Sequence, residues 1–137
     1  MKTHLNPYLS FRDTAREAME FYQSVFGGEL TMSTFAEFQV SDDPAESEKL
    51  MHANLTTPGG LIIMAADTPL SAERSSTSFV TMSLNGDDEA ELRRYWDTLS
   101  TGGTITQPLE KAQWGDVFGM CTDRFGVDWM INVVAAP

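Results

Sequence analysis

The sequence predicts an α+β fold built from two βαβββ modules, which form a curved mixed sheet around a concave pocket. One observation is that a strand, a helix and three further strands follow one another twice, with Gly27-Gly28 ending the first helix and Gly102-Gly103 the second. Another is that each helix has a single apolar face, which must be buried against a sheet. We therefore expect a single domain over residues 1–137, composed of modules at residues 1–67 and 77–137 and a joint at residues 68–76.

In the first module, residues 5–11 are predicted as a strand, and Pro7 places it at a sheet edge or at its own start. A helix follows, because Thr14 and Glu17 have the spacing of a capping box. Apolar side chains recur at helical spacing on one face of this helix, at Ala18, Phe21, Tyr22 and Val25.

The rest of the first module is predicted as three strands. Residues 29–38 form the second strand, and residues 50–57 and 61–66 form a hairpin around Pro58-Gly59-Gly60. Residues 40–49 are acidic and lack periodicity, which is typical of a solvated loop; a flap over the pocket is the alternative.

The second module repeats this order. Residues 78–85 are a predicted strand, and residues 87–100 a helix with Asp88 and Glu91 at capping-box spacing. Its apolar face carries Leu92, Tyr95, Trp96 and Leu99. Three strands follow, at residues 104–111, 117–122 and 128–134, and in the last turn Gly126 can supply a positive φ while Asp123 bonds its own backbone.

The pleat separates an apolar side of each strand from a mixed one. We expect the apolar sides to face the helices, among them Val80, Met82 and Leu84 in one strand and Trp129, Ile131 and Val133 in another. The mixed sides, apolar but with Thr, Ser and Asn among them, would then line the pocket.

Composition limits the function classes. No apolar run approaches the length of a membrane span, and the start does not have the pattern of a signal peptide, so we expect a cytoplasmic protein. The one cysteine excludes an internal disulfide. A net charge of −11 argues against nucleic acids and anionic membranes as partners, because both need a basic surface.

Several segments along the whole chain resemble the vicinal oxygen chelate superfamily of glyoxalases, extradiol dioxygenases and bleomycin-resistance proteins, and more closely its PhnB-like branch. The matching residues are Pro7-Tyr8-Leu9-Ser10-Phe11, Glu20-Phe21-Tyr22, Phe26-Gly27-Gly28-Glu29-Leu30, His52-Ala53, Trp114-Gly115, Phe118-Gly119, Thr122-Asp123-Arg124-Phe125-Gly126-Val127 and Trp129-Met130-Ile131-Asn132. Some members of this branch carry the name of a demethylubiquinone methyltransferase, yet the sequence has no glycine-rich strand-to-helix turn for a nucleotide cofactor.

The resemblance also implies where a metal would sit. Metal-using members place His, Gln or Glu on the first and last strands of each half, and those positions fall near Pro7, Met64, Thr81 and Asn132 here. None of these is a good ligand for zinc, nickel or iron, so we expect neither the usual metal site nor a cofactor. The alternative is a divalent metal on a displaced ligand set, such as His52 with Asp67 or Glu37.

His52 is the main candidate for chemistry, as a general base or a hydrogen-bonding contact; the alternative is a histidine tied to a carbonyl or a dimer contact. Trp114, Phe118, Met120 and Phe35 are the candidates for contacts with an apolar ligand, although for each of them ordinary core packing is the slightly favoured alternative. The complete set of predicted ligand-binding residues is His52, Asn54, Phe35, Met64, Thr81, Ser83, Trp114, Phe118, Met120 and Asn132.

Three functions remain open at this point. The first is a small-molecule-binding protein that holds an apolar or aromatic ligand in the pocket without a metal. The second is a metal-dependent lyase, isomerase or dioxygenase of the glyoxalase kind, and the third is an interaction subunit without a small ligand. Whether the chain is an enzyme is therefore left open.

Exposed strand edges, together with the resemblance, predict a homodimer.

Overall fold

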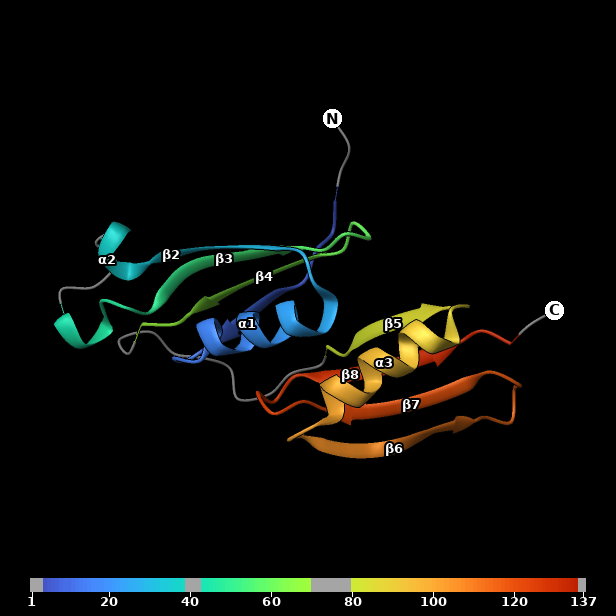
Figure 1. The fold of residues 1–137 in the computed structure, drawn as a ribbon. Helices are drawn as coiled ribbons and strands as arrows, with labels where there is room; N and C mark the ends of the chain where they lie inside the picture. Colours follow the sequence, from blue (N-terminus) through green and yellow to red (C-terminus); the bar gives the residue numbers. More distant parts are fainter. Residues whose placement is uncertain (1–3, 39–42, 70–79, 136–137) are drawn as a thin grey trace. The chain divides into compact units, whose positions relative to one another are not determined.

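The computed structural model describes residues 4–38, 43–69 and 80–135 of the chain. It contains two compact units, residues 1–77 and residues 78–137. Each unit holds one four-stranded mixed sheet and one long helix, so the predicted α+β class is confirmed (Figure 1). Most of the predicted joint, residues 70–76, lies outside the described residues.

The first unit has the predicted strand–helix–strand order, with two short helical segments inserted before the hairpin. Its sheet runs in the order β1-β4-β3-β2, with β1 parallel to β4 and the other neighbours antiparallel. The elements are β1 (Tyr8–Phe11), α1 (Ala15–Phe26), β2 (Glu29–Thr34), α2 (Phe35–Phe38), the 3₁₀ turn η1 (Pro44–Glu46), β3 (Leu50–Thr56) and β4 (Ile62–Asp67).

The second unit repeats the topology of the first. Its sheet order is β5-β8-β7-β6, with β5 parallel to β8, which matches the first sheet strand for strand. The predicted duplication therefore extends to strand order and direction. The elements are β5 (Met82–Gly86), α3 (Glu89–Ser100), β6 (Thr104–Lys111), β7 (Val117–Thr122) and β8 (Asp128–Val133).

The turns before the last strand of each unit also share their hydrogen bonds. In the first, the Thr57 amide donates to the Leu61 carbonyl over 2.9 Å, and the Thr57 hydroxyl accepts from the Leu61 amide over 3.0 Å. In the second, the Asp123 amide donates to the Val127 carbonyl over 2.8 Å, and the Asp123 carboxylate accepts from the Val127 amide over 3.1 Å. Asp123 thus shapes the hairpin as predicted.

The double glycines let the chain pass close to the sheet after each helix. A Cβ atom on Gly28 would lie 2.2 Å from the Thr56 carbonyl oxygen, and one on Gly103 would lie 2.1 Å from the Thr122 carbonyl oxygen. No side chain fits at that distance, so only glycine permits this approach. The second glycine of each pair is therefore required by the contact that follows the helix.

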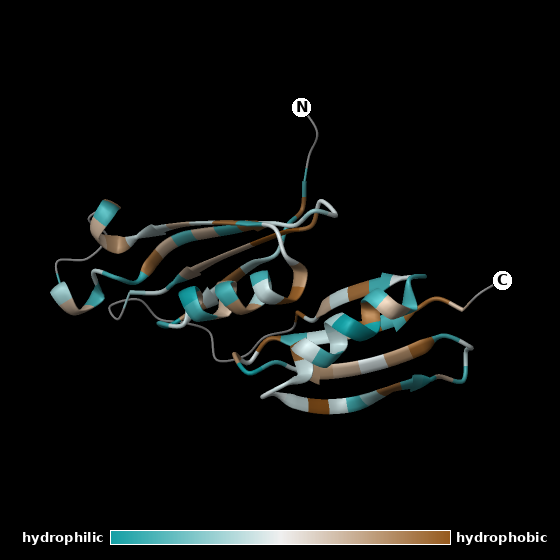
Figure 2. Cartoon of the chain, in the orientation of Figure 1, coloured by the Kyte–Doolittle hydropathy of each residue, from teal (hydrophilic) through white to brown (hydrophobic). Residues whose placement is uncertain are grey.

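Each helix buries one face against its own sheet. Helix α3 buries Leu92, Trp96 and Leu99, as predicted, with Tyr95 at the margin. Both helices show hydrophilic and hydrophobic residues along their length, the pattern of a half-buried helix (Figure 2). In α1 the buried residues are Ala15, Ala18, Met19, Tyr22 and Phe26, so the buried face is rotated slightly from the predicted one, and Phe21 and Val25 are only half-buried.

Two local predictions are wrong in the first unit. The second strand ends at Thr34 rather than at residue 38, because the chain turns into α2 and buries Phe35. Thr14 precedes α1 but makes no side-chain cap, so the capping box is not formed. In contrast, the Asp88 carboxylate does cap α3, accepting from the Glu91 amide over 3.1 Å. The predicted strand start at residues 78 and 79 lies outside the described residues.

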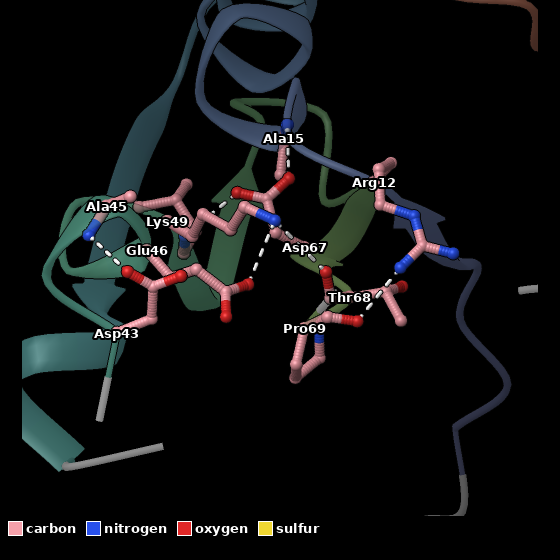
Figure 3. A network of polar contacts seen from close by, with 10 residues as sticks. Arg12, Ala15, Asp43, Ala45, Glu46, Lys49, Asp67, Thr68 and Pro69 are labelled. Carbon is pink, nitrogen blue, oxygen red and sulfur yellow. Dashed lines mark hydrogen bonds and ion pairs between the residues drawn. The ribbon is translucent and has the colours of Figure 1, made fainter. Parts of the chain in front are cut away.

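The start of α1 is instead held by Asp67, at the end of β4 (Figure 3). One carboxylate oxygen of Asp67 accepts from the Ala15 amide and the other from the Leu50 amide, each over 2.9 Å. Beside it, Lys49 forms a largely buried ion pair with Glu46 over 3.1 Å and also donates to the Thr68 carbonyl over 3.4 Å. Asp67 therefore joins the helix, β3 and β4 at one buried point.

Replacing Asp67 should destabilise the first unit strongly. Asp67→Ala leaves two buried amides without acceptors, which costs about 2–5 kcal/mol in the free energy of unfolding. Asp67→Asn should cost about half as much, since its one carbonyl oxygen can satisfy only one amide. Chemical denaturation measures both, with the exposed Asp13→Ala as the control. An Asp67→Ala protein as stable as the control would contradict this role.

Candidate functional site

The candidate binding surfaces are the sheet faces that lie opposite the helices, which we call the distal faces. Side chains alternate along each strand, and directly opposed residues on neighbouring strands share a face. The face that each helix covers carries the buried side chains, which are Ala53, Ile63 and Ala65 in the first sheet and Trp129, Ile131 and Val133 in the second. These apolar sides therefore face the helices, as the sequence predicted. Val80 is an exception, because it precedes β5 and is 68% exposed.

The distal face of the first sheet carries a tyrosine–histidine pair. The Tyr8 hydroxyl lies 3.2 Å from His52 Nδ1, and the two ring centroids are 5.7 Å apart. Tyr8 is 50% exposed and His52 is half-buried, so the pair lies at the surface of this unit. Among the described residues, the hydrogen-bond partner of the His52 side chain is thus a phenol and not a backbone carbonyl.

Two other predicted residues lie beside this pair. Tyr8, Met64 and Asn54 are opposed across β1, β4 and β3 and form one row. Asn54 donates its amide to the Thr56 hydroxyl over 3.0 Å. Met64 supplies a thioether between the two polar side chains. This face therefore combines an apolar strip with a few oriented polar groups.

The distal face of the second sheet is richer in apolar side chains. Phe118, Met120 and Met130 lie on it, with Ser83 and Asn132 as polar neighbours. The 63%-exposed Trp114 packs edge-on against Phe118, with ring centroids 5.5 Å apart. This combination of aromatic and thioether groups with a few amides and hydroxyls is typical of small-molecule sites.

Asn132 is oriented by Asp116, which stands at the start of β7. One Asp116 oxygen accepts from Asn132 Nδ2 over 3.0 Å, and the other accepts from the Ala135 amide over 2.8 Å. These hydrogen bonds, that of Asn132 first, hold the pKa of the Asp116 carboxyl below its ordinary value. The ionised Asp116 is therefore the form that holds the end of β8 in place.

The remaining predicted residues are placed elsewhere. Phe35 is 1% exposed, so its ring belongs to the core of the first unit and not to a distal face. Thr81 lies exposed just before β5, and Pro7 precedes β1. Both oxygens of Asp67 accept hydrogen bonds from buried backbone amides, those of Ala15 and Leu50.

Among residues 4–38, 43–69 and 80–135, no three His, Cys, Asp or Glu side chains gather as metal ligands. Glu37 is engaged locally, with the Thr34 hydroxyl 3.3 Å from its carboxylate. The expectation that the usual metal site is missing, and its alternative of a displaced ligand set, both stay predictions.

Cys121 is buried in β7 beneath the helix. Burial first, and then the nearby Asp123 and Asp128, raise the pKa of its thiol to about 11. The thiol is therefore protonated at neutral pH and is not an activated nucleophile.

Comparison with known proteins identifies the family. A family model described as 3-demethylubiquinone-9 3-methyltransferase matches residues 3–132. Protein YjdN of Escherichia coli (strain K12) is 35% identical, over 95% of this chain and 95% of its own. The chain belongs to this PhnB-like family.

Solved structures share the fold of this chain. Protein PA1353 from Pseudomonas aeruginosa is 35% identical, covers 98% of this chain and 100% of its own, and has a TM-score of 0.82. A Bacillus cereus protein described as a putative 3-demethylubiquinone-9 3-methyltransferase, PhnB protein, is 23% identical with a TM-score of 0.75, covering 96% and 100%. The fold is also that of a member of the glyoxalase/bleomycin resistance protein/dioxygenase superfamily from Sphaerobacter thermophilus, which is 19% identical with a TM-score of 0.59, covering 98% of this chain and 100% of its own.

In this PhnB-like protein the sequence did not point to Tyr8 or Asp116 as site residues. Each has a local feature in the sequence that could have indicated it. Tyr8 alternates with Ser10 on the mixed side of the first strand, and Asp116 immediately precedes β7. What the sequence lacks is the strand register that brings Tyr8 to His52 and Asp116 to Asn132.

In the described part of the chain, no helix has both the length and the apolar character needed to cross a membrane.

The lowered pKa of Asp116 predicts a pH dependence of stability. A carboxyl group whose pKa is lower in the folded state stabilises the fold above its unfolded pKa, and this contribution is lost as the pH falls through the folded value. Below about pH 4, the wild type should therefore lose stability more steeply than Asp116→Asn. Thermal unfolding between pH 7 and pH 2.5 measures this, and parallel curves for the two proteins would contradict it.

Proposed function

We propose that this PhnB-like protein binds a small apolar or aromatic molecule on the distal faces of its sheets, without the metal site of its superfamily. The observation that supports the proposal best is the second sheet's distal face, where Phe118, Met120 and Met130 lie together beside an oriented amide. Flat and flexible apolar groups bind aromatic ligands well, and isolated polar groups fix their orientation.

The exposed tryptophan strengthens this proposal. Trp96 and Trp129 are 7% and 1% exposed and belong to the core, whereas Trp114 is 63% exposed and contacts Phe118. A large aromatic side chain at the margin of an apolar face can cover a bound ring. Tyr8 and His52 offer a second set of contacts on the first sheet, where a bound ligand could meet a phenol and an imidazole.

A thermal-shift screen against aromatic and glycopeptide compounds tests the proposal. A compound that binds the folded protein should raise its melting temperature, since saturation at 100 times the dissociation constant adds about 2.7 kcal/mol. Trp114→Ala should weaken binding by about 2- to 10-fold, whereas Phe38→Ala should not. Phe38 is a suitable control because it is also an exposed aromatic residue, 56% exposed, but lies on α2.

Three results would contradict the proposal. The wild type could be stabilised by none of the compounds, or Trp114→Ala and Phe38→Ala could weaken binding equally. Binding could also vanish in excess EDTA and return with zinc or nickel, which would favour the metal-dependent alternative.

We further propose that the protein acts as a cytoplasmic homodimer. Among the strands that the structure describes, β1 and β2 are the edges of the first sheet and β5 and β6 those of the second, and edge strands favour pairing or cover. A closed two-fold pair is the commonest way for identical chains to cover such edges. Multi-angle light scattering should give twice the chain mass of 15.2 kDa, and a mass of one chain at micromolar concentration would contradict this.

A further inference from the structure

We propose that the distal face of the second sheet selects ligands that carry a hydrogen-bond donor on an aromatic or apolar body, and that Asn132, oriented by Asp116, makes this selection. The inference rests on the proposed function and names the chemical class of the ligand. It follows from the chemistry of the two side chains and the row of residues around them.

The orientation of the Asn132 amide follows from its partner. An ionised carboxylate can only accept hydrogen bonds, so the Asn132 atom 3.0 Å from Asp116 must be the NH₂ nitrogen. The Asp116 carboxylate cannot turn freely, because its other oxygen accepts from the Ala135 amide over 2.8 Å. Asn132 is therefore left with its carbonyl oxygen, an acceptor that has no hydrogen-bond partner in the described part of the chain.

The neighbours of Asn132 add a second amide on one side, and an apolar surface followed by a carboxylate acceptor on the other. Asn85, Asn132, Phe118 and Glu110 are opposed in sequence across β5, β8, β7 and β6 and form one row on the distal face. Phe118 offers a ring beside the Asn132 carbonyl, and the exposed Glu110 carboxylate beyond it also only accepts. With a net charge of −11, the chain also attracts cationic ligands and repels anions.

The substitution Asp116→Asn should reverse this selection without removing the support. The new side-chain carbonyl can still accept from the Ala135 amide, and its NH₂ group then faces Asn132. Asn132 must turn its own carbonyl toward that donor, so its NH₂ group becomes the group presented to a ligand. The variant should therefore prefer ligands that carry an acceptor.

Three bicyclic probes of similar shape separate these preferences. Indole has one N–H donor, indene has neither donor nor acceptor, and 1-indanone has a carbonyl acceptor. Dissociation constants from ligand-observed NMR should show indole binding the wild type about 2- to 10-fold more tightly than indene, with 1-indanone no better than indene. In Asp116→Asn the advantage should pass to 1-indanone by a similar factor.

Two controls keep the outcome interpretable. Asp128→Asn changes a carboxylate at the opposite end of β8, which accepts from the Thr122 hydroxyl over 2.6 Å, and it should leave the preference for indole unchanged. Asn132→Leu removes the amide and should bind all three probes with no preference. If Asp116 had a merely structural role, this variant would keep the preference for indole.

The possible failures are distinguishable. If all three probes bind the wild type equally well, or if Asp116→Asn keeps the preference for indole, this inference is overturned while ligand binding on the face stands. If none of the probes binds and the thermal-shift screen also finds no ligand, the proposed function fails together with the inference.

Discussion

In the described part of the chain, one long helix covers one face of each four-stranded sheet, and the rest of the structure depends on this limited cover. Because a helix covers only one face of its sheet, the buried apolar residues of the strands lie on that face. They include Ala53 and Ala65 in one unit and Trp129 and Ile131 in the other. The opposite faces are then free to carry side chains chosen for something other than the core. Their mixture of methionine, aromatic, amide and hydroxyl groups is what the proposed function rests on.

The duplication explains why corresponding turns and close contacts in the two units are stabilised in the same way. Gly28 and Gly103 allow the chain to pass against a strand carbonyl, and Thr57 and Asp123 close corresponding turns. Differences between the units are confined to places where local contacts diverge. In the first, Asp67 anchors the helix start from the far end of β4, whereas in the second, Asp88 does so from the preceding residue. The polar groups of the distal faces also differ between the units, with Tyr8 and His52 paired in the first and Asp116 and Asn132 in the second.

These differences also mark what could be read from the sequence. The order of strands and helices along the chain follows from short-range periodicity and from glycine positions, and the sequence predicts it. The buried face of α3 is also predicted, whereas that of α1 is rotated slightly from the prediction. The Asp88 cap is local and was predicted, but the Thr14 cap was not formed, because Asp67, distant in sequence, takes its place. Phe35 was assigned to a pocket wall, since nothing in residues 29–38 signals that the strand ends at Thr34. Contacts such as Tyr8–His52 require the register of strands that are far apart in the chain.

The methionines offer the most direct measurement of the central claim, which is that ligands bind to the faces opposite the helices. Met64, Met120 and Met130 lie on the distal faces, whereas Met19 and Met32 lie on the helix side, the latter with its sulfur 4.0 Å from Arg16 of α1. Methyl NMR of a methionine-labelled protein, titrated with an aromatic compound, should show ring-current shifts at one or more of the three distal methyl groups and none at Met19 or Met32. Shifts at Met19 and Met32 alone, or no shifts with any aromatic compound, would contradict the account.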